Sequence, residues 1–193
     1  MTDTRICFIG DSFVNGTGDE TMLGWAGRLC ADARQKGHDI TYYNLGIRRN
    51  TSTDILQRWH EIALRQHPDC DNRIVLSCGV NDTTLENDLL RVEFETSLQN
   101  MRDLFARMQS ALGLVIGPPP VDDDRQNQRI QTLSNAMQIE AEKAGLPFIP
   151  LFDGLIQDKA YLAEIAQNDG AHPTSSGYQT ITRIILNSGK WWF

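Results

Sequence analysis

Short apolar runs alternate along the chain with longer segments in which apolar residues recur every three or four positions. This alternation predicts strands separated by amphipathic helices. The runs that predict strands are 5–10, 40–45, 73–78, 114–116 and 148–151. The segments that predict helices are 25–36, 53–65, 91–112, 130–144 and 175–186. Strands that follow one another through helices form a parallel sheet with both faces covered, so the pattern predicts an α/β fold, a three-layer α/β/α sandwich.

The size and charge of the chain narrow its class. A chain of 193 residues is expected to form one domain, spanning 1–193, with a core large enough to fold without disulfides. The net charge of −7 disfavours nucleic acid or an anionic membrane as the main partner. The first apolar run, 6–9, is too short for a secretory signal, and no apolar stretch approaches the roughly 20 residues that span a bilayer. The four cysteines lack CxxC spacing and are expected to be reduced thiols. A cytoplasmic location is therefore expected.

Candidate functional residues follow several of the predicted strands at the point where each strand ends. Ser12 comes just after the first strand, Gly46 after the second, and Asn81 after the third. The segment 169–172 directly precedes the last predicted helix. In open parallel sheets, ligands bind outside the carboxyl ends of the strands. These four places are thus expected on one rim of the sheet, which makes that rim the predicted site.

The residue types at this rim predict nucleophilic catalysis. A serine hydroxyl becomes a useful nucleophile when a histidine within hydrogen-bond reach takes its proton. Of the four histidines, His172 is the candidate base, because Asp169 precedes it by three residues and Pro173 stiffens the chain after it. A carboxylate at that spacing can fix the imidazole tautomer and stabilise the imidazolium. Ser12, His172 and Asp169 are therefore the predicted catalytic residues.

Acyl transfer also needs hydrogen-bond donors for the developing oxyanion. The candidates are the backbone N–H groups of Ser12 and Gly46 and the side-chain amide of Asn81. Taken singly, Gly46 and Asn81 are equally typical of turns that follow strands. Their shared position with Ser12 favours the oxyanion role.

These residues resemble the four signature blocks of the SGNH hydrolase superfamily, also called the GDSL lipase/esterase family. The blocks are 10–13, with Phe13 where the name-giving leucine usually stands, and then 44–46, 79–82 and 169–173. The resemblance implies a flavodoxin-like sandwich with five parallel strands. It also implies the triad Ser12, Asp169 and His172, the oxyanion donors Ser12, Gly46 and Asn81, and ester hydrolysis with no metal or other cofactor.

The expected activity is therefore serine ester hydrolysis through an acyl-enzyme, on a small-molecule ester with a short acyl chain. Thioester or carbohydrate acetyl ester hydrolysis on the same triad remains an alternative. A non-catalytic flavodoxin-like binder is a second alternative, in which the loop 10–18 holds a phosphate through backbone amides. That loop lacks the GxGxxG spacing and the lysine of phosphate-binding motifs. A non-catalytic binder would also leave residues 169–172 without a function.

Three further segments carry hypotheses of their own. Arg48 and Arg49 follow Gly46, where the related family commonly has a small polar turn, and predict a preference for anionic substrate groups. The aspartates 122–124 are interpreted as a helix cap rather than a metal site. The apolar tail 191–193 either folds back onto the domain or forms a contact between subunits of a homo-oligomer.

Overall fold

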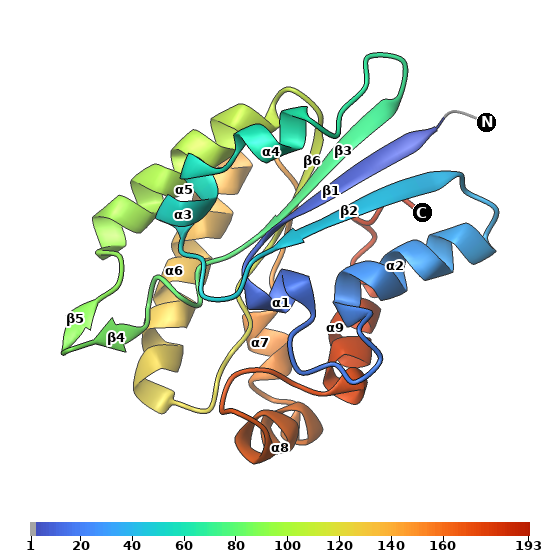
Figure 1. Cartoon of the computed structure of the whole chain (residues 1–193). Helices are drawn as coiled ribbons and strands as arrows, with labels where there is room; N and C mark the ends of the chain where they lie inside the picture. The colour runs from blue at the N-terminus through green and yellow to red at the C-terminus, as the bar shows by residue number, and fades with distance from the viewer. Residues whose placement is uncertain (1–2) are drawn as a thin grey trace.

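One parallel sheet organises residues 3–193, the part of the chain that the computed structural model describes. Its five strands lie in the order β2-β1-β3-β6-β7, and every neighbouring pair is parallel (Figure 1). The strands are β1 (Thr4–Gly10), β2 (Ile40–Gly46), β3 (Asp71–Ser77), β6 (Leu112–Ile116) and β7 (Phe148–Ile149). The strand order reverses beside β1, which is the flavodoxin-like arrangement. The predicted fold class is therefore confirmed.

Helices cover both faces of this sheet. The longer ones are α2 (Gly24–Gln35), α5 (Phe94–Met108), α6 (Asp124–Lys143), α8 (Lys159–Gln167) and α9 (Ser175–Asn187). The shorter ones are α1 (Ser12–Asn15), α3 (Ser52–Gln57), α4 (His60–Ala63) and α7 (Phe152–Leu155). Figure 1 shows α2 and α9 on one side of the sheet, with α3, α4, α5 and α6 on the other.

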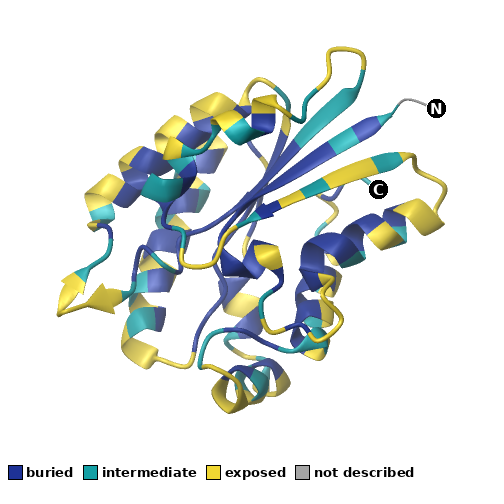
Figure 2. Ribbon diagram, viewed as in Figure 1, coloured by how far each residue is buried: buried dark blue, intermediate teal, exposed yellow. Residues whose placement is uncertain are grey.

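The two faces of β1 contribute to two different hydrophobic clusters of the core. Side chains alternate across a strand, so Ile6 and Phe8 face α2 and α9, whereas Cys7 and Ile9 face α5 and α6. All four are at most 1% exposed. Such a strand reads as a continuous apolar run because it is buried on both sides (Figure 2). Strand β2 lies at the edge of the sheet and is more exposed, as its colouring in Figure 2 shows.

The structure differs from the predicted elements where polar contacts override the apolar pattern. The predicted helix 53–65 is broken into α3 and α4 at Arg58. That side chain turns towards the sheet, and its Nη2 donates to the backbone oxygens of Gly10 and Leu45 at 2.8 Å each. The predicted helix 91–112 is shorter, because a hairpin of β4 (Leu85–Glu86) and β5 (Leu89–Leu90) precedes it. The predicted helix 130–144 begins earlier, at a cap formed by Asp123, whose Oδ1 accepts the Gln126 N–H at 2.8 Å.

The apolar tail folds back onto the body of its own chain. Trp191 is 7% exposed and lies against Phe8, with ring centroids 6.2 Å apart. The guanidinium of Arg73 lies 5.0 Å from the ring centroid of Trp192 and 4.5 Å from that of Phe193. Of the two predicted roles for 191–193, folding back is the one observed. A contact between chains through this tail stays a prediction.

No helix within residues 3–193 combines the length and the apolar character that crossing a bilayer requires.

Candidate active site

Ser12 lies at the carboxyl end of β1, where the chain turns directly into the short helix α1. Asp11 caps that helix, since its Oδ1 accepts the Phe13 N–H at 2.9 Å. As the first residue of the helix, Ser12 has a backbone N–H that no carbonyl of the same helix can accept. Only 4% of Ser12 is exposed. The turn thus presents a hydroxyl and a free backbone donor together.

The imidazole of His172 bridges this hydroxyl to a carboxylate. Its Nε2 lies 2.7 Å from Ser12 Oγ, and its Nδ1 lies 2.7 Å from Asp169 Oδ2. With Asp169 ionised, Nδ1 carries the proton and donates it, which leaves Nε2 as the acceptor for the Ser12 hydroxyl. Residues 160 positions apart are therefore joined in one hydrogen-bonded line.

Asp169 is the most accessible member of this line, with 43% of its side chain exposed. Partial burial acts to raise its pKa, but the hydrogen bonds from the backbone and ring of His172 and from Ala171 N–H hold the pKa below its ordinary value. Its Oδ1 accepts the N–H groups of Ala171 at 3.0 Å and His172 at 2.8 Å. The Asp-x-x-His turn thus keeps the carboxylate ionised and aligned with the ring.

Side chains from outside this turn fix its position. The amide of Asn168 donates to the backbone oxygen of His172 at 2.9 Å. Glu164 on α8 accepts the N–H groups of Thr174 at 3.1 Å and Gly177 at 2.9 Å, so it caps α9 directly after the turn. The ring of Phe13 packs on that of His172 with centroids 4.9 Å apart. The hydrogen bonds therefore fix the backbone of the turn, and Phe13 supports one face of the imidazole.

The predicted oxyanion donors Asn81 and Gly46 differ in whether a proton remains for a substrate. The Asn81 amide donates one proton to the backbone oxygen of Asn50 at 3.0 Å, which leaves its second proton unused by that bond. The Gly46 N–H donates to Oδ1 of Asn44 at 3.0 Å. A Cβ on Gly46 would lie 2.2 Å from the backbone nitrogen of Asn15, so this glycine lets the β2 end pack against α1. Gly46 therefore has a packing reason that does not involve its N–H.

The loop after Gly46 contains a residue that the sequence did not single out for its backbone. Arg49 has φ of +67°, a left-handed conformation that side chains rarely adopt. Its backbone oxygen accepts Nη2 of Arg91 at 2.7 Å, and its guanidinium pairs with Glu86 of the hairpin. The β4–β5 hairpin therefore holds this loop in a strained conformation beside the site.

The two adjacent arginines differ in their surroundings. Arg49 is engaged with Glu86, as described, whereas Arg48 is exposed and has no acidic partner within 4 Å in the described part of the chain. Of the pair, Arg48 is the one whose charge is available to a ligand.

Two carboxylates close to the candidate site are buried. Asp11 and Asp82 are each 1% exposed. Asp82 accepts the Ser52 N–H at 2.8 Å and the Ser52 hydroxyl at 2.5 Å, whereas Oδ2 of Asp11 is buried without a hydrogen-bond partner in the described structure. Burial raises the pKa of Asp11 to about 7, the Phe13 N–H offsets part of that rise, and the charge of Asp82 adds to it. Burial likewise raises the pKa of Asp82.

The family follows from a comparison with known families. A profile of the GDSL-like lipase/acylhydrolase family matches residues 8–180, which contain all the side chains described above. The chain belongs to this family. As a GDSL-like lipase/acylhydrolase, it is a hydrolase that acts on esters.

Solved structures share the fold of this GDSL-like hydrolase. A lipase/acylhydrolase from Enterococcus faecalis is 24% identical with a TM-score of 0.80, over 97% of this chain and 95% of the other. Axe2, an acetylxylan esterase from Geobacillus stearothermophilus, is 20% identical with a TM-score of 0.76, over 95% and 92% of the two chains. The psychrotrophic esterase EstA from Pseudoalteromonas sp. is 20% identical with a TM-score of 0.73, over 97% of each chain. Curated proteins gave no significant match.

Proposed function

We propose that this GDSL-like hydrolase is a serine esterase that cleaves carboxylic esters of short acyl groups through an acyl-enzyme on Ser12. The observation that carries the proposal is the continuous line from Ser12 Oγ through His172 to Asp169, with 2.7 Å at each junction. Hydroxyl, imidazole and carboxylate in this order make up the arrangement that activates a serine nucleophile. Short acyl groups are favoured because, within residues 3–193, the segments between the strands and helices are short and include no long insertion that would form a lid.

The first half of the reaction forms the acyl-enzyme. Ser12 Oγ attacks the ester carbonyl carbon while its proton passes to Nε2 of His172. The resulting imidazolium is stabilised by Asp169. When the tetrahedral intermediate collapses, the bond to the alcohol oxygen breaks, and Nε2 returns the proton to that oxygen.

The second half consumes one water molecule. Water attacks the acyl carbon as Nε2 takes one of its protons, and collapse breaks the bond between that carbon and Ser12 Oγ. The proton on Nε2 passes to Oγ, so the enzyme is restored and the acid is released.

Two donors are proposed for the oxyanion: the Ser12 backbone N–H and the second amide proton of Asn81. Both are held by their surroundings before the substrate arrives, which is what makes such donors effective. Gly46 is proposed to shape this loop, because its own N–H already donates to Asn44.

One relative supports the assignment of nucleophile and base by residue type. Structures of Axe2 include catalytic mutants in which a serine or a histidine is replaced by alanine. The same two residue types lie 2.7 Å apart here, in Ser12 and His172. The likeness to an acetylxylan esterase also favours a second candidate substrate class, acetyl esters of carbohydrates.

The experiment is hydrolysis of p-nitrophenyl esters from acetate to decanoate by the wild type and by S12A and H172A. Removing the nucleophile or the base is expected to lower kcat by about 10⁶-fold, as in other serine hydrolases. S110A is the matched control, because Ser110 is exposed just after the end of α5 and bonds only the backbone oxygen of Arg107, so this variant should retain full activity. An S12A variant that keeps more than about 1% of wild-type kcat would overturn the proposal.

The substrate class is resolved in the same assay by adding acetylated xylo-oligosaccharides and a short-chain thioester. Preference for the sugar acetate over p-nitrophenyl acetate in kcat/KM would favour the carbohydrate candidate. A higher kcat/KM for the thioester than for either ester would identify the enzyme as a thioesterase instead.

A further inference from the structure

We propose that the cleft between α5 and α6 binds an aliphatic carboxylate, with the hydrocarbon chain in an apolar pocket and the carboxylate on Arg129. The pocket lies apart from Ser12, His172 and Asp169, none of which lines it. This inference does not depend on the proposed catalytic function.

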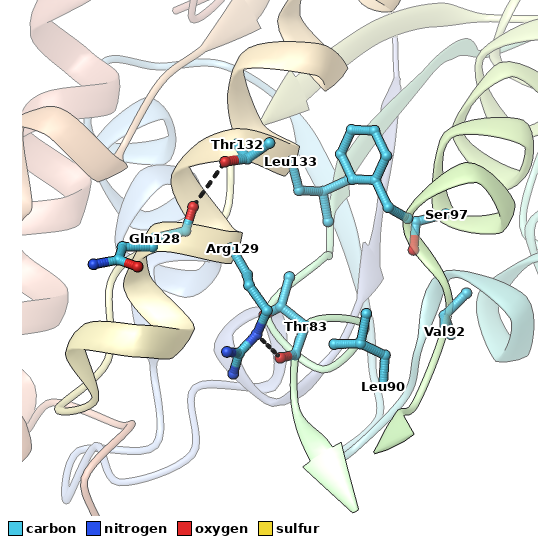
Figure 3. A pocket seen from close by; sticks show the side chains of 9 residues that line it. Thr83, Leu90, Val92, Ser97, Gln128, Arg129, Thr132 and Leu133 are labelled. Atoms are coloured by element: carbon cyan, nitrogen blue, oxygen red, sulfur yellow. Dashed lines mark hydrogen bonds between the residues drawn. The ribbon is translucent and has the colours of Figure 1, made fainter. Parts of the chain in front are cut away.

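The pocket has the size and lining of a small-molecule site. Its volume is about 330 Å³, which falls within the range of roughly 300–1,000 Å³ typical of ligand pockets. Figure 3 shows its two helical walls, with Leu133 from α6 on one side and Ser97 from α5 on the other, and Leu90 of the hairpin at the lower end. Its apolar lining residues are Leu90, Val92, Phe94 and Leu133. A surface of this kind is matched by a hydrocarbon chain rather than by a polar group.

Arg129 provides one fixed cation in this lining. Its Nε donates to the backbone oxygen of Thr83 at 2.9 Å, which anchors the guanidinium beside Thr83 at the edge of the pocket (Figure 3). Within residues 3–193 Arg129 forms no ion pair with a carboxylate, and its Nε bond to Thr83 is its one hydrogen bond, so the Nη groups have no partner there. A guanidinium presents parallel N–H groups that match both oxygens of a carboxylate. An apolar pocket with one unpaired guanidinium therefore fits an amphipathic acid.

The pocket also backs onto the loop that carries Asn81. Thr83, which lines the pocket, follows Asn81 by two residues. Ser97, another lining residue, donates a hydrogen bond to the buried carboxylate of Asp82. A bound chain would thus contact the side of this loop that faces α5 and α6.

The test is calorimetric titration of the full-length chain with straight-chain alkanoates from butanoate to decanoate, and with the alcohols of equal length. Affinity should rise about fourfold for each added methylene until the pocket is full. T132W places an indole in the pocket from an exposed helix position and should abolish binding, whereas N135W, exposed on α6 outside the pocket, should not. R129Q should weaken decanoate about tenfold and leave decanol unchanged, whereas the exposed control R125Q should affect neither.

Each outcome decides the proposal. Binding that T132W leaves intact, or that is indifferent to chain length, would overturn it, as would equal losses for acid and alcohol in R129Q. The S12A variant should bind decanoate as the wild type does. Binding confined to a chain with an intact Ser12 would place the acid at the catalytic site and would refute the separate pocket without bearing on ester hydrolysis.

Discussion

Replacing Asp11 by asparagine should change how the stability of the fold depends on pH. The carboxyl of Asp11 is buried, and one of its oxygens has no hydrogen-bond partner in the described structure. Its pKa is about 7 in the folded chain, compared with an ordinary value of 3.8. Between these values the folded chain keeps a proton that the unfolded chain has lost, so raising the pH favours unfolding.

The magnitude follows from the two pKa values. Ionising Asp11 costs the fold about 1.4 kcal/mol for each pH unit in this range, and about 4 kcal/mol over the whole of it. Asparagine keeps the acceptor for the Phe13 N–H and carries no charge. Any cost of burying its amide group is independent of pH, so it cancels when the two proteins are compared across the range.

The assay is equilibrium urea unfolding of the wild type and D11N, followed by circular dichroism at about pH 4.5, 5.5 and 6.5. The difference in unfolding free energy should move in favour of D11N by about 1.4 kcal/mol per pH unit. D39N is the control, because the Asp39 side chain is 53% exposed and pairs with Arg34 at the surface. Stability differences between wild type and D11N that stay constant from one pH to the next would refute the reasoning.

Three further predictions concern activity. D169N should lower kcat/KM by about 100-fold, less than the roughly 10⁴-fold seen for a fully buried aspartate. The smaller loss is expected because the Asp169 side chain is 43% exposed, so water can replace part of its role. A loss below about threefold would contradict this. N81A should lower kcat by about 100- to 1000-fold with little change in KM, since an oxyanion donor acts in the transition state; an effect on KM alone would exclude that role. R48A should reduce the preference for anionic over neutral esters by up to about fivefold. R49A should change this preference less, because Arg49 is already paired with Glu86. An unchanged preference in both variants would refute the role of these arginines in substrate selection.

The centre of the sheet was predictable because its strands are buried on both faces there. Strand β1 reads as an unbroken apolar run, and the order of strands and helices follows directly from the alternation of apolar periods. The short elements were not predictable in the same way. Helix α1 has four residues, too few to show a helical period, and it is set by the cap at Asp11. The hairpin β4–β5 has two residues in each strand and turns at 87–88, where both residues have positive φ.

The sequence was sufficient to predict which side chains of the candidate site lie together, because their positions relative to strands and to one another determine this. Ser12 follows a strand, and the Asp-x-x-His spacing brings Asp169 and His172 together within one turn. The direction of a single N–H group is not a property of spacing. Whether Gly46 donates to a substrate or to Asn44 depends on a side chain two residues earlier, and the role of Arg49 depends on Glu86, which lies 37 residues away.

The central claim is that His172 activates Ser12 as a nucleophile, and covalent labelling tests it most directly. The wild type is treated with a fluorophosphonate, and the modified residue is located by peptide mass spectrometry. One phosphonyl group per chain is expected, on Ser12, and H172A should keep its fold but be labelled far more slowly. Label on any other residue, or equal labelling rates in the wild type and H172A, would contradict it.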